Sequence, residues 1–455
     1  MKPSNNHQKF IELREKHPRF IFDNYTLTKS STELKIKFQF SLNDCHFFQP
    51  EIRFPINNDF ISSDFDEAGW NNLAFHLGMI EMLSYWKCAC SPTIVIKQFK
   101  LNKDQIDWWK KLYYHGLGEF FYLNGIDTNE DDFVQFECES DEILQPFDLN
   151  LQNKVLVPVG GGKDSIVSLE TLKKSDLEIL PLLLNPNPSR DRTVETAGIS
   201  DAFIVSRTLD KELLKLNDEG YLNGHTPFSA LLAFISIGAA ILSKSKHIAL
   251  SNESSANEAT DLESGANHQY SKSFEFESDF RNYLKKYIHS DVNYFSFLRP
   301  LNELQIAKLF SKHQKHFAGF RSCNAGSKKD IWCCNCSKCL FIYIILAAFL
   351  DEERMMEIFG ENLLNREDLK HIFNELCGIH PVKPFECVGS YDDVNFALNL
   401  IIEKSENHPY LIQYYIDSSI SKKHQHINSL SYLKAINPEH FLEANFEQIL
   451  NSELI

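Results

Sequence analysis

Residues 155–165 have the sequence VLVPVGGGKDS, in which an apolar run leads into three glycines and then into a polar segment that begins a helical pattern. A short apolar run followed by glycine is typical of a buried strand that ends in a tight turn. Glycine lets backbone N–H groups approach an anion closely, and the N-terminal end of the next helix attracts negative charge. The stretch therefore predicts a strand, a helix and between them a phosphate-binding loop, which comprises Gly160, Gly161, Gly162, Lys163, Asp164 and Ser165.

Two other glycine-rich loops do not fit this stretch. A Walker A loop requires serine or threonine directly after its lysine, whereas Asp164 follows Lys163 here. The dinucleotide-binding fingerprint requires a third spaced glycine at the position that Ser165 occupies. The stretch resembles the SGGxDS loop of the PP-loop ATP pyrophosphatases, with Gly160 in place of the first serine. That resemblance implies cleavage of ATP to AMP and pyrophosphate; the alternative is a glycine-rich turn that binds no ligand.

The remaining pattern predicts the fold class. Downstream of the loop, apolar strands expected at 179–184, 202–205 and 247–250 alternate with helical stretches at 211–216 and 229–242. This alternation is typical of a parallel sheet covered by helices on both faces. Upstream, alternating residues within 33–54 predict antiparallel strands, and residues 70–86 and 103–114 have helical spacing.

We therefore expect an α/β fold in three parts. The first is an N-terminal α+β domain over residues 1–150. The second, over 151–350, is an ATP-binding domain with a Rossmann-like parallel sheet flanked by helices. Because of its loop, this domain resembles the adenine nucleotide alpha hydrolases. The third is a helical C-terminal region over 351–455.

Charge and hydropathy exclude some classes of partner. The 455 residues include 46 Lys and Arg against 62 Asp and Glu, a net charge of −16, which argues against a nucleic-acid substrate. The polar first 20 residues lack the apolar core of a signal peptide. Apolar stretches at 227–242 and 340–350 fall short of the roughly 20 residues that a membrane span needs. We expect a cytoplasmic protein with neither a nucleic-acid nor a membrane partner.

A cysteine cluster predicts a metal site. Four thiols are spaced C-x9-C-x2-C-x2-C, a pattern that can supply four tetrahedral ligands to Zn²⁺: Cys323, Cys333, Cys336 and Cys339. Cys334 lies beside them, so the sequence leaves the ligand set ambiguous. The alternative is a group of reduced thiols that only pack together.

Polar residues follow the predicted strands. In a parallel α/β sheet, ligands bind beyond the carboxyl ends of the strands, so the segments at 251–257 and 267–273 should line the crevice that holds the phosphate loop. Arg299, after another expected strand, is a candidate anion clamp. The alternatives are a solvated loop and, for Arg299, a surface ion pair.

A wider set of motifs carries a specific resemblance between about residues 70 and 395. Its members are residues 76–81 (HLGMIE), 116–121 (GLGEFF), 158–165 (PVGGGKDS), 223–225 (NGH), 251–253 (SNE), 267–273 (NHQYSKS), 299–301 (RPL), 322–324 (SCN), 336–339 (CSKC) and 383–389 (KPFECVG). As a set these motifs resemble the UDP-N-acetylmuramoyl-L-alanyl-L-glutamate epimerase family (MurL). That family is implied to convert the terminal L-Glu of UDP-MurNAc-L-Ala-L-Glu to D-Glu with ATP, through an acyl-adenylate.

The resemblance implies roles for particular residues. The phosphate loop binds ATP, and Asp164 helps to hold Mg²⁺. Substrate or AMP contacts are expected from Asn252, Asn267, Gln269 and Arg299. Proton transfer is expected from Lys272 and His268, with Glu253 or Cys323 behind them. Two rivals remain: another PP-loop enzyme, such as a 7-cyano-7-deazaguanine synthase or a tRNA-modifying enzyme, and an inactive nucleotide sensor.

Overall fold

The structure is a computed structural model that describes residues 4–56, 67–257, 269–289, 291–323, 325–326, 329–380, 382–404, 406–424 and 429–454. The chain forms two compact units. The first comprises residues 1–156, 203–248 and 266–294, and the second comprises 157–202, 249–265 and 295–455. Each unit is built from separate stretches of sequence. The three-part division at residues 150 and 350 stays a prediction.

The strands form one large mixed sheet in the order β11-β10-β7-β8-β9-β4-β2-β1-β5-β6, with β3 paired to β2. Their bounds are β1 Arg19–Lys29, β2 Glu33–Leu42, β3 His46–Phe48, β4 Glu51–Pro55, β5 Thr93–Ile96, β6 Gln135–Cys138, β7 Gln152–Pro158, β8 Glu178–Leu184, β9 Phe203–Thr208, β10 Ser245–Leu250 and β11 Asn293–Ser296. Parallel pairs include β7 with β10, β1 with β5 and β5 with β6. The α/β class is confirmed.

The sheet is less uniformly parallel than the sequence predicts. Strand β9 was expected in a parallel sheet, but it pairs antiparallel with β4, and β4 pairs antiparallel with β2. The antiparallel strands predicted within residues 33–54 are confirmed. Strand β9 needs a partner for its backbone N–H and C=O groups, and that partner, β4, belongs to the antiparallel group β4-β2-β1, which makes the sheet mixed.

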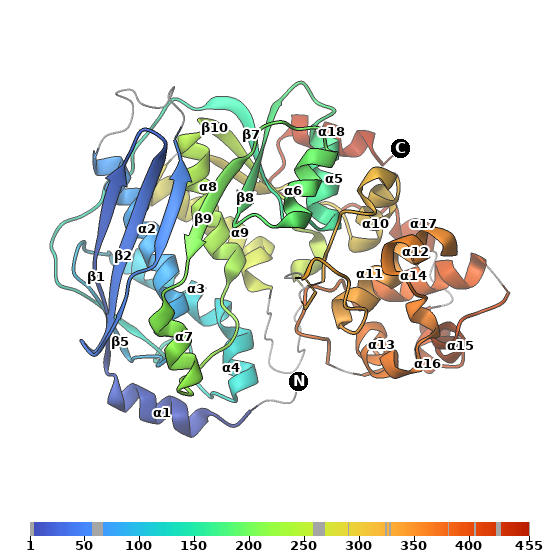
Figure 1. Cartoon of the computed structure of the whole chain (residues 1–455), viewed down its shortest axis with the longest axis horizontal. Helices are drawn as coiled ribbons and strands as arrows, with labels where there is room; N and C mark the ends of the chain where they lie inside the picture. The colour runs from blue at the N-terminus through green and yellow to red at the C-terminus, as the bar shows by residue number, and fades with distance from the viewer. Residues whose placement is uncertain are drawn as a thin grey trace. The chain divides into compact units, whose positions relative to one another are not determined.

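In the first unit, hydrophobic patterning explains the local structure. Alternate residues of β2 are 0–2% exposed, namely Leu34, Ile36, Phe38, Phe40 and Leu42. Helix α2 packs against β1, β2 and α8 and is buried along most of its length (Figure 1). The helices of this unit are α1 His7–Lys16, α2 Glu67–Trp86, α3 Lys103–Gly116, α4 Gly118–Asn124, α7 Lys211–Asp218, α8 Phe228–Leu242, η3 Tyr270–Lys272 and α9 Phe274–Tyr287.

The second unit contains β8 and a set of helices. They are α5 Lys163–Leu172, α6 Pro188–Thr196, η2 Ser254–Asn257, α10 Glu303–Ser311, η4 Gln314–His316, α11 Ser337–Ala347, α12 Glu352–Phe359, η6 Leu363–Asn365, η7 Glu367–Leu369, α13 Lys370–Cys377, α14 Tyr391–Lys404, α15 Tyr410–Ile416, α16 Ser419–His424, α17 Ser429–Tyr432 and α18 Ala444–Ser452. Helix α11 packs against α12, α13 and α14, and α10 packs against α5. The helical C-terminal region is confirmed. Among the described residues, no helix is long and apolar enough to cross a membrane.

Candidate functional site

The phosphate loop, residues 160–165, joins β7 to α5 as the sequence predicts. Gly161 has φ +83°, a left-handed conformation that favours glycine. A Cβ atom on Gly161 would lie 2.5 Å from Ser189 Oγ, and one on Gly162 would lie 2.7 Å from Ser322 Oγ. A Cβ atom on Gly160 would meet nothing within 4 Å. Gly161 is therefore favoured by its positive φ and its close backbone neighbours, Gly162 lies against the Ser322 hydroxyl, and Gly160 has room for a side chain.

Lys163 is the first residue of α5 and is 0% exposed. Its ammonium group contacts the carboxylates of Asp164 and Glu303. Burial by itself would lower the pKa of Lys163, but these two carboxylates raise the pKa above its ordinary value. Lys163 is therefore held as a cation at the N-terminal end of α5. The positive end of the helix dipole at this place also favours an anionic ligand.

Glu303 is a site residue that the sequence reasoning missed. Burial raises its pKa well above the ordinary value, and the nearby charges of Asp164 and Glu253 act in the same direction, while Lys163 opposes them. A signal was present, because Asn302 and Gln305 form a capping box at the start of α10 and so place Glu303 in its first turn. Nothing in the sequence linked that turn to the phosphate loop.

The predicted residues Asn252, Glu253 and Arg299 also lie in the second unit. Arg299 is 0% exposed, and its guanidinium donates a 2.8 Å hydrogen bond to the backbone carbonyl of Glu253. Asn252 donates a 3.1 Å hydrogen bond to Ser296 Oγ. Arg299 is thus buried and fixes the segment that carries Glu253; the alternative of a surface ion pair is wrong. Its predicted contact with an anion stays a prediction.

Gln269 and Lys272 lie in the first unit. Gln269 is buried, and its backbone carbonyl accepts a 2.7 Å hydrogen bond from the backbone N–H of Lys272. Lys272 is half-buried at the end of η3. The predicted residues Asn267 and His268 lie outside the residues that the structure describes.

The four predicted metal-binding cysteines come together in the second unit. Their sulfur atoms all lie within 4.8 Å of one another. Cys336 Sγ lies 3.5 Å from Cys339 Sγ and 4.0 Å from Cys323 Sγ, and the distance from Cys333 Sγ to Cys339 Sγ is 3.7 Å. A tetrahedral zinc site with Zn–S bonds near 2.3 Å requires sulfur separations of about 3.8 Å. The four thiols therefore fit a zinc ion.

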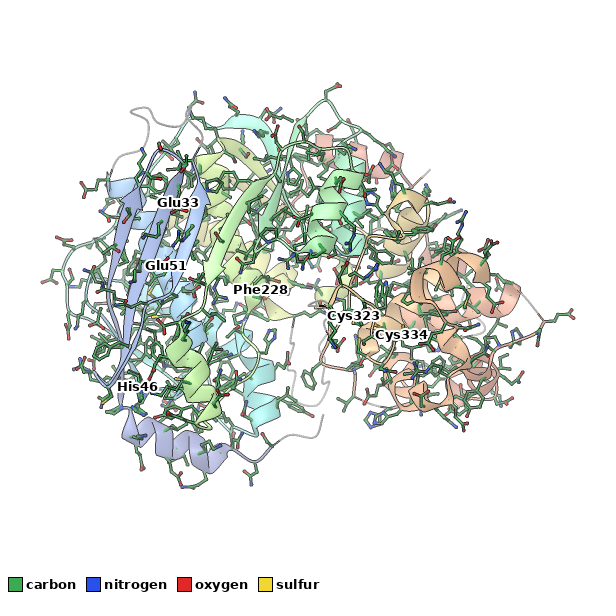
Figure 2. All side chains as sticks on the ribbon, in the orientation of Figure 1. Glu33, His46, Glu51, Phe228, Cys323 and Cys334 are labelled. Atoms are coloured by element: carbon green, nitrogen blue, oxygen red, sulfur yellow. The ribbon has the colours of Figure 1, made fainter. Side chains whose placement is uncertain are left out.

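Cys334 does not belong to this cluster. It has φ +55°, and its sulfur lies 3.6 Å from the carbonyl oxygen of Phe359 instead (Figure 2 labels Cys323 and Cys334). The structure thus resolves the choice of thiols that the sequence left ambiguous. The motif at 383–389 adjoins the cluster, because the Glu386 carboxylate accepts a 3.1 Å hydrogen bond from the backbone N–H of Lys338 in α11.

Comparison with known proteins identifies the family. The MurL N-terminal domain matches residues 12–297, and the MurL C-terminal domain matches residues 319–429. A relative from Xanthomonas oryzae pv. oryzae is 32% identical over 338 residues, which cover 72% of this chain and 74% of the relative. Relatives from a Micromonospora species and from Salinispora tropica are each 34% identical; the matches cover 72% of this chain in both cases, and 74% and 73% of the relatives. All three are named UDP-N-acetyl-alpha-D-muramoyl-L-alanyl-L-glutamate epimerases. This chain therefore belongs to the MurL family of epimerases.

Proposed function

We propose that this enzyme converts the terminal L-Glu of UDP-MurNAc-L-Ala-L-Glu to D-Glu, and that it uses ATP to activate the glutamate as an acyl-adenylate. The names of its relatives support the substrate and the inversion. The observation that carries the ATP-dependent step is the loop at residues 160–165, where two closely packed glycines precede a buried lysine at a helix N-terminus.

The adenylate explains how an unreactive carbon exchanges its proton. A carboxylate next to a developing carbanion repels its charge. Joining the α-carboxylate to AMP removes that charge, so that the α-proton becomes far more acidic. A base then removes the proton, and a second group returns one to the opposite face. Hydrolysis of the adenylate releases AMP and leaves D-Glu with a free α-carboxylate at the end of the dipeptide. Pyrophosphate leaves in the first step, and this makes the cycle one-directional.

The residues of the second unit have roles in adenylation. The N–H groups of the phosphate loop and the Lys163 ammonium bind the phosphates of ATP. Asp164, in the first turn of α5, offers carboxylate oxygens of the kind that Mg²⁺ prefers, and Mg²⁺ supplies neutralising charge when bound. Glu253, Asn252 and Arg299 shape the site for AMP or for the activated carboxylate. Zn²⁺ at the four-cysteine cluster has a structural role.

One experiment tests the proposal. The protein is incubated with UDP-MurNAc-L-Ala-L-Glu, ATP and Mg²⁺ in deuterated water, and AMP, glutamate chirality and α-deuterium are measured. D-Glu that carries deuterium, with AMP formed in matching amount, is the expected result. ATP binding without AMP formation would instead favour a nucleotide sensor.

A further inference from the structure

The proposed chemistry gives no role to the motif at residues 383–389, and this motif ends beside Glu303. A Cβ atom on Gly389 would lie 2.8 Å from Asp393 Oδ2 and 3.1 Å from Glu303 Cγ. Asp393 is 0% exposed and belongs to helix α14 of the second unit. The end of the motif therefore packs against two buried carboxylates, one of which contacts the Lys163 ammonium.

Asp393 is held at the start of α14 by a capping box. Its Oδ2 atom accepts hydrogen bonds from the backbone N–H of Ser390 at 2.8 Å and from the Ser390 hydroxyl at 2.7 Å. In return, the backbone N–H of Asp393 donates a 3.0 Å hydrogen bond to Ser390 Oγ. This reciprocal pair fixes the carboxylate, so Asp393 cannot easily move away from a side chain at position 389.

The second oxygen of Asp393 reaches another helix. Asp393 Oδ1 accepts a 3.3 Å hydrogen bond from the backbone N–H of Leu304 and a 3.0 Å hydrogen bond from the Tyr432 hydroxyl. Leu304 is the second residue of α10 and follows Glu303 directly. The first N–H groups of a helix have no acceptor within that helix, and the positive end of the helix dipole attracts a carboxylate. Asp393 thus caps the first turn of α10 as well as that of α14.

The segment 432–435 holds the same turn of α10 through side chains. Asn302 donates a 3.0 Å hydrogen bond to the carbonyl of Tyr432, and Gln305 donates hydrogen bonds of 3.1 and 3.0 Å to two further carbonyls of the segment. Asn302 and Gln305 are the two members of the capping box of α10, and they flank Glu303. The residues on both sides of Glu303 are therefore tied to the C-terminal part of the second unit.

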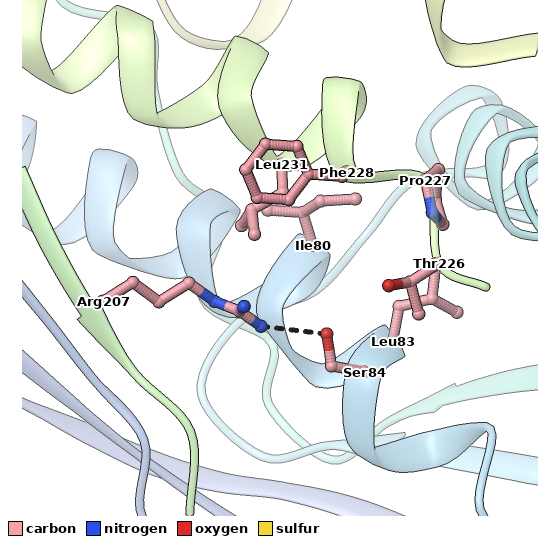
Figure 3. A pocket seen from close by; sticks show the side chains of 8 residues that line it. All are labelled: Ile80, Leu83, Ser84, Arg207, Thr226, Pro227, Phe228 and Leu231. Carbon is pink, nitrogen blue, oxygen red and sulfur yellow. Dashed lines mark hydrogen bonds between the residues drawn. The ribbon is translucent and has the colours of Figure 1, made fainter. Parts of the chain in front are cut away.

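A second buried ion pair shows why Glu303 needs these contacts. In the first unit, Arg207 donates hydrogen bonds of 2.7 Å to Glu81 and 3.0 Å to Ser84 beside a small pocket (Figure 3). Glu81 lies within the long helix α2, whose backbone hydrogen bonds hold it on both sides. Glu303 is instead the first residue of its helix, and helix ends fray. Contacts from outside α10 therefore determine where the Glu303 carboxylate lies.

The position of Glu303 in turn affects the position of Lys163. Each is the first residue of its helix, and the two helices, α5 and α10, pack against each other. The Lys163 and Glu303 side chains are 1% and 5% exposed, and the ammonium contacts the carboxylate directly. A buried charge is costly unless a partner is held beside it. Together with Asp164, Glu303 therefore restricts where the Lys163 ammonium lies in the phosphate loop.

We propose that Asp393 is a positioning residue for ATP cleavage, which fixes the first turn of α10 so that Glu303 holds the Lys163 ammonium in place for the phosphates of ATP. This inference rests on the proposed function. Asp393 acts through Glu303 and needs no contact with ATP itself. The inference gives the helical C-terminal region a task in adenylation, and it explains why glycine occupies position 389.

The test measures ATP binding by calorimetry and AMP formation with UDP-MurNAc-L-Ala-L-Glu. Asp393→Ala should raise the Kd for ATP about tenfold, as expected when a hydrogen bond from a charged group weakens. It should lower kcat for AMP formation by about 10²-fold, the effect of displacing a group by about 1 Å from its productive position. A variant that only folds poorly would bind fewer ATP molecules per chain, but each with the wild-type Kd. The Kd therefore separates positioning from loss of folded protein.

The double variant Asp393→Ala/Glu303→Gln shows whether Asp393 acts through Glu303. If it does, Asp393→Ala should change neither the Kd for ATP nor kcat when it is added to Glu303→Gln, although it should still lower the free energy of unfolding. Equal effects of Asp393→Ala in the wild-type and Glu303→Gln backgrounds would overturn the assignment.

Asn395→Ala is the matched control, because Asn395 is a buried polar residue of the same helix with other partners. Its side chain donates a 3.1 Å hydrogen bond to the carbonyl of Cys377 and accepts a 2.7 Å hydrogen bond from the Tyr415 hydroxyl. Asn395→Ala should lower stability and leave the Kd and kcat unchanged. If Asp393→Ala does not fold, Tyr432→Phe removes a single hydroxyl from Asp393 and should act in the same direction, with Tyr415→Phe as its control.

The outcomes distinguish this inference from the proposed function. A wild-type Kd and kcat in folded Asp393→Ala, or in Tyr432→Phe where only that variant folds, would overturn the assignment. So would equal effects of Asn395→Ala and Asp393→Ala. ATP binding without AMP formation by the wild-type enzyme would contradict the proposed function alone, because the Kd values would still test the positioning of Lys163.

Discussion

The backbone N–H of Arg321 donates a 2.9 Å hydrogen bond to the carbonyl of Gly161. Ser322, the next residue, places its hydroxyl 2.7 Å from the position that a Cβ atom on Gly162 would take, and Cys323 follows directly. The phosphate loop is thus joined within the second unit to the segment that carries the first thiol of the cysteine cluster. A metal ion at that cluster would hold this segment, and through it the loop, in place.

Loss of one thiol of the cluster should therefore affect both zinc binding and ATP binding. Cys323→Ser should lower the zinc content from about one ion per chain towards zero and weaken ATP binding, as measured by elemental analysis and calorimetry. Cys334→Ser is the matched control, because Cys334 lies outside the cluster, and it should retain both. Full zinc content in Cys323→Ser would show that this thiol is not a ligand.

Gly161 and Gly160 should respond differently to alanine. Gly161→Ala places a Cβ atom 2.5 Å from Ser189 Oγ at a positive φ, so we expect it to cost about 1–3 kcal/mol of folding free energy and to impair ATP binding. Gly160→Ala meets open space and should bind ATP as the wild type does. Equal ATP affinities for the two variants would contradict this account of the loop.

Lys163 should matter for stability as well as for ATP cleavage. Lys163→Met should abolish AMP formation and cost about 3–5 kcal/mol, because it leaves Glu303 buried without its cation. The double variant Lys163→Met/Glu303→Gln should recover much of the stability, measured by chemical denaturation, but none of the AMP formation. AMP formation by the single variant would show that Lys163 does not act on ATP.

His76 should make the first unit sensitive to acid. Its ring nitrogens lie 2.8 Å from the carbonyl of Asn72 and 3.0 Å from the hydroxyl of Tyr283, and burial lowers its pKa to about 4. Because the folded pKa lies below the unfolded value of 6.5, the unfolded chain binds more protons between pH 6.5 and 4. Stability should fall across that window by about 3 kcal/mol.

The measurement is the free energy of unfolding at pH 7 and at pH 4.5 for the wild type and for His76→Gln. Other titrating groups contribute equally to both proteins, so the difference between their pH slopes isolates His76. Equal slopes would mean that the imidazole does not titrate with a lowered pKa.

Part of this site could be predicted from the sequence, because it depends on residue patterns within short segments. The strand, glycine loop and helix at 152–172 form as predicted, because apolar run, glycine and helical periodicity each act within a few residues. The spacing of the clustered thiols likewise predicted their meeting. Neither required knowledge of distant contacts.

Other features depended on contacts that no local pattern encodes. Glu303 reaches Lys163 although 140 residues separate them, and Asp393 reaches the backbone of Leu304 across 89 residues. The antiparallel pairing of β9 with β4 likewise joins segments that lie far apart in the sequence. Arg299 is buried and holds the Glu253 backbone, which rules out the alternative of a surface ion pair, while its contact with an anion stays a prediction.

The sequence by itself determined the glycine loop between β7 and α5, the four-thiol spacing and the family, because each rests on residue type at short or fixed spacing. The tertiary structure decided which thiol stands apart, which carboxylate faces Lys163 and which carboxylate caps the first turn of α10. These depend on side-chain packing between segments that lie far apart along the chain, and hydrophobic burial that brings them together is non-directional. Only the folded chain specifies which polar groups finally meet.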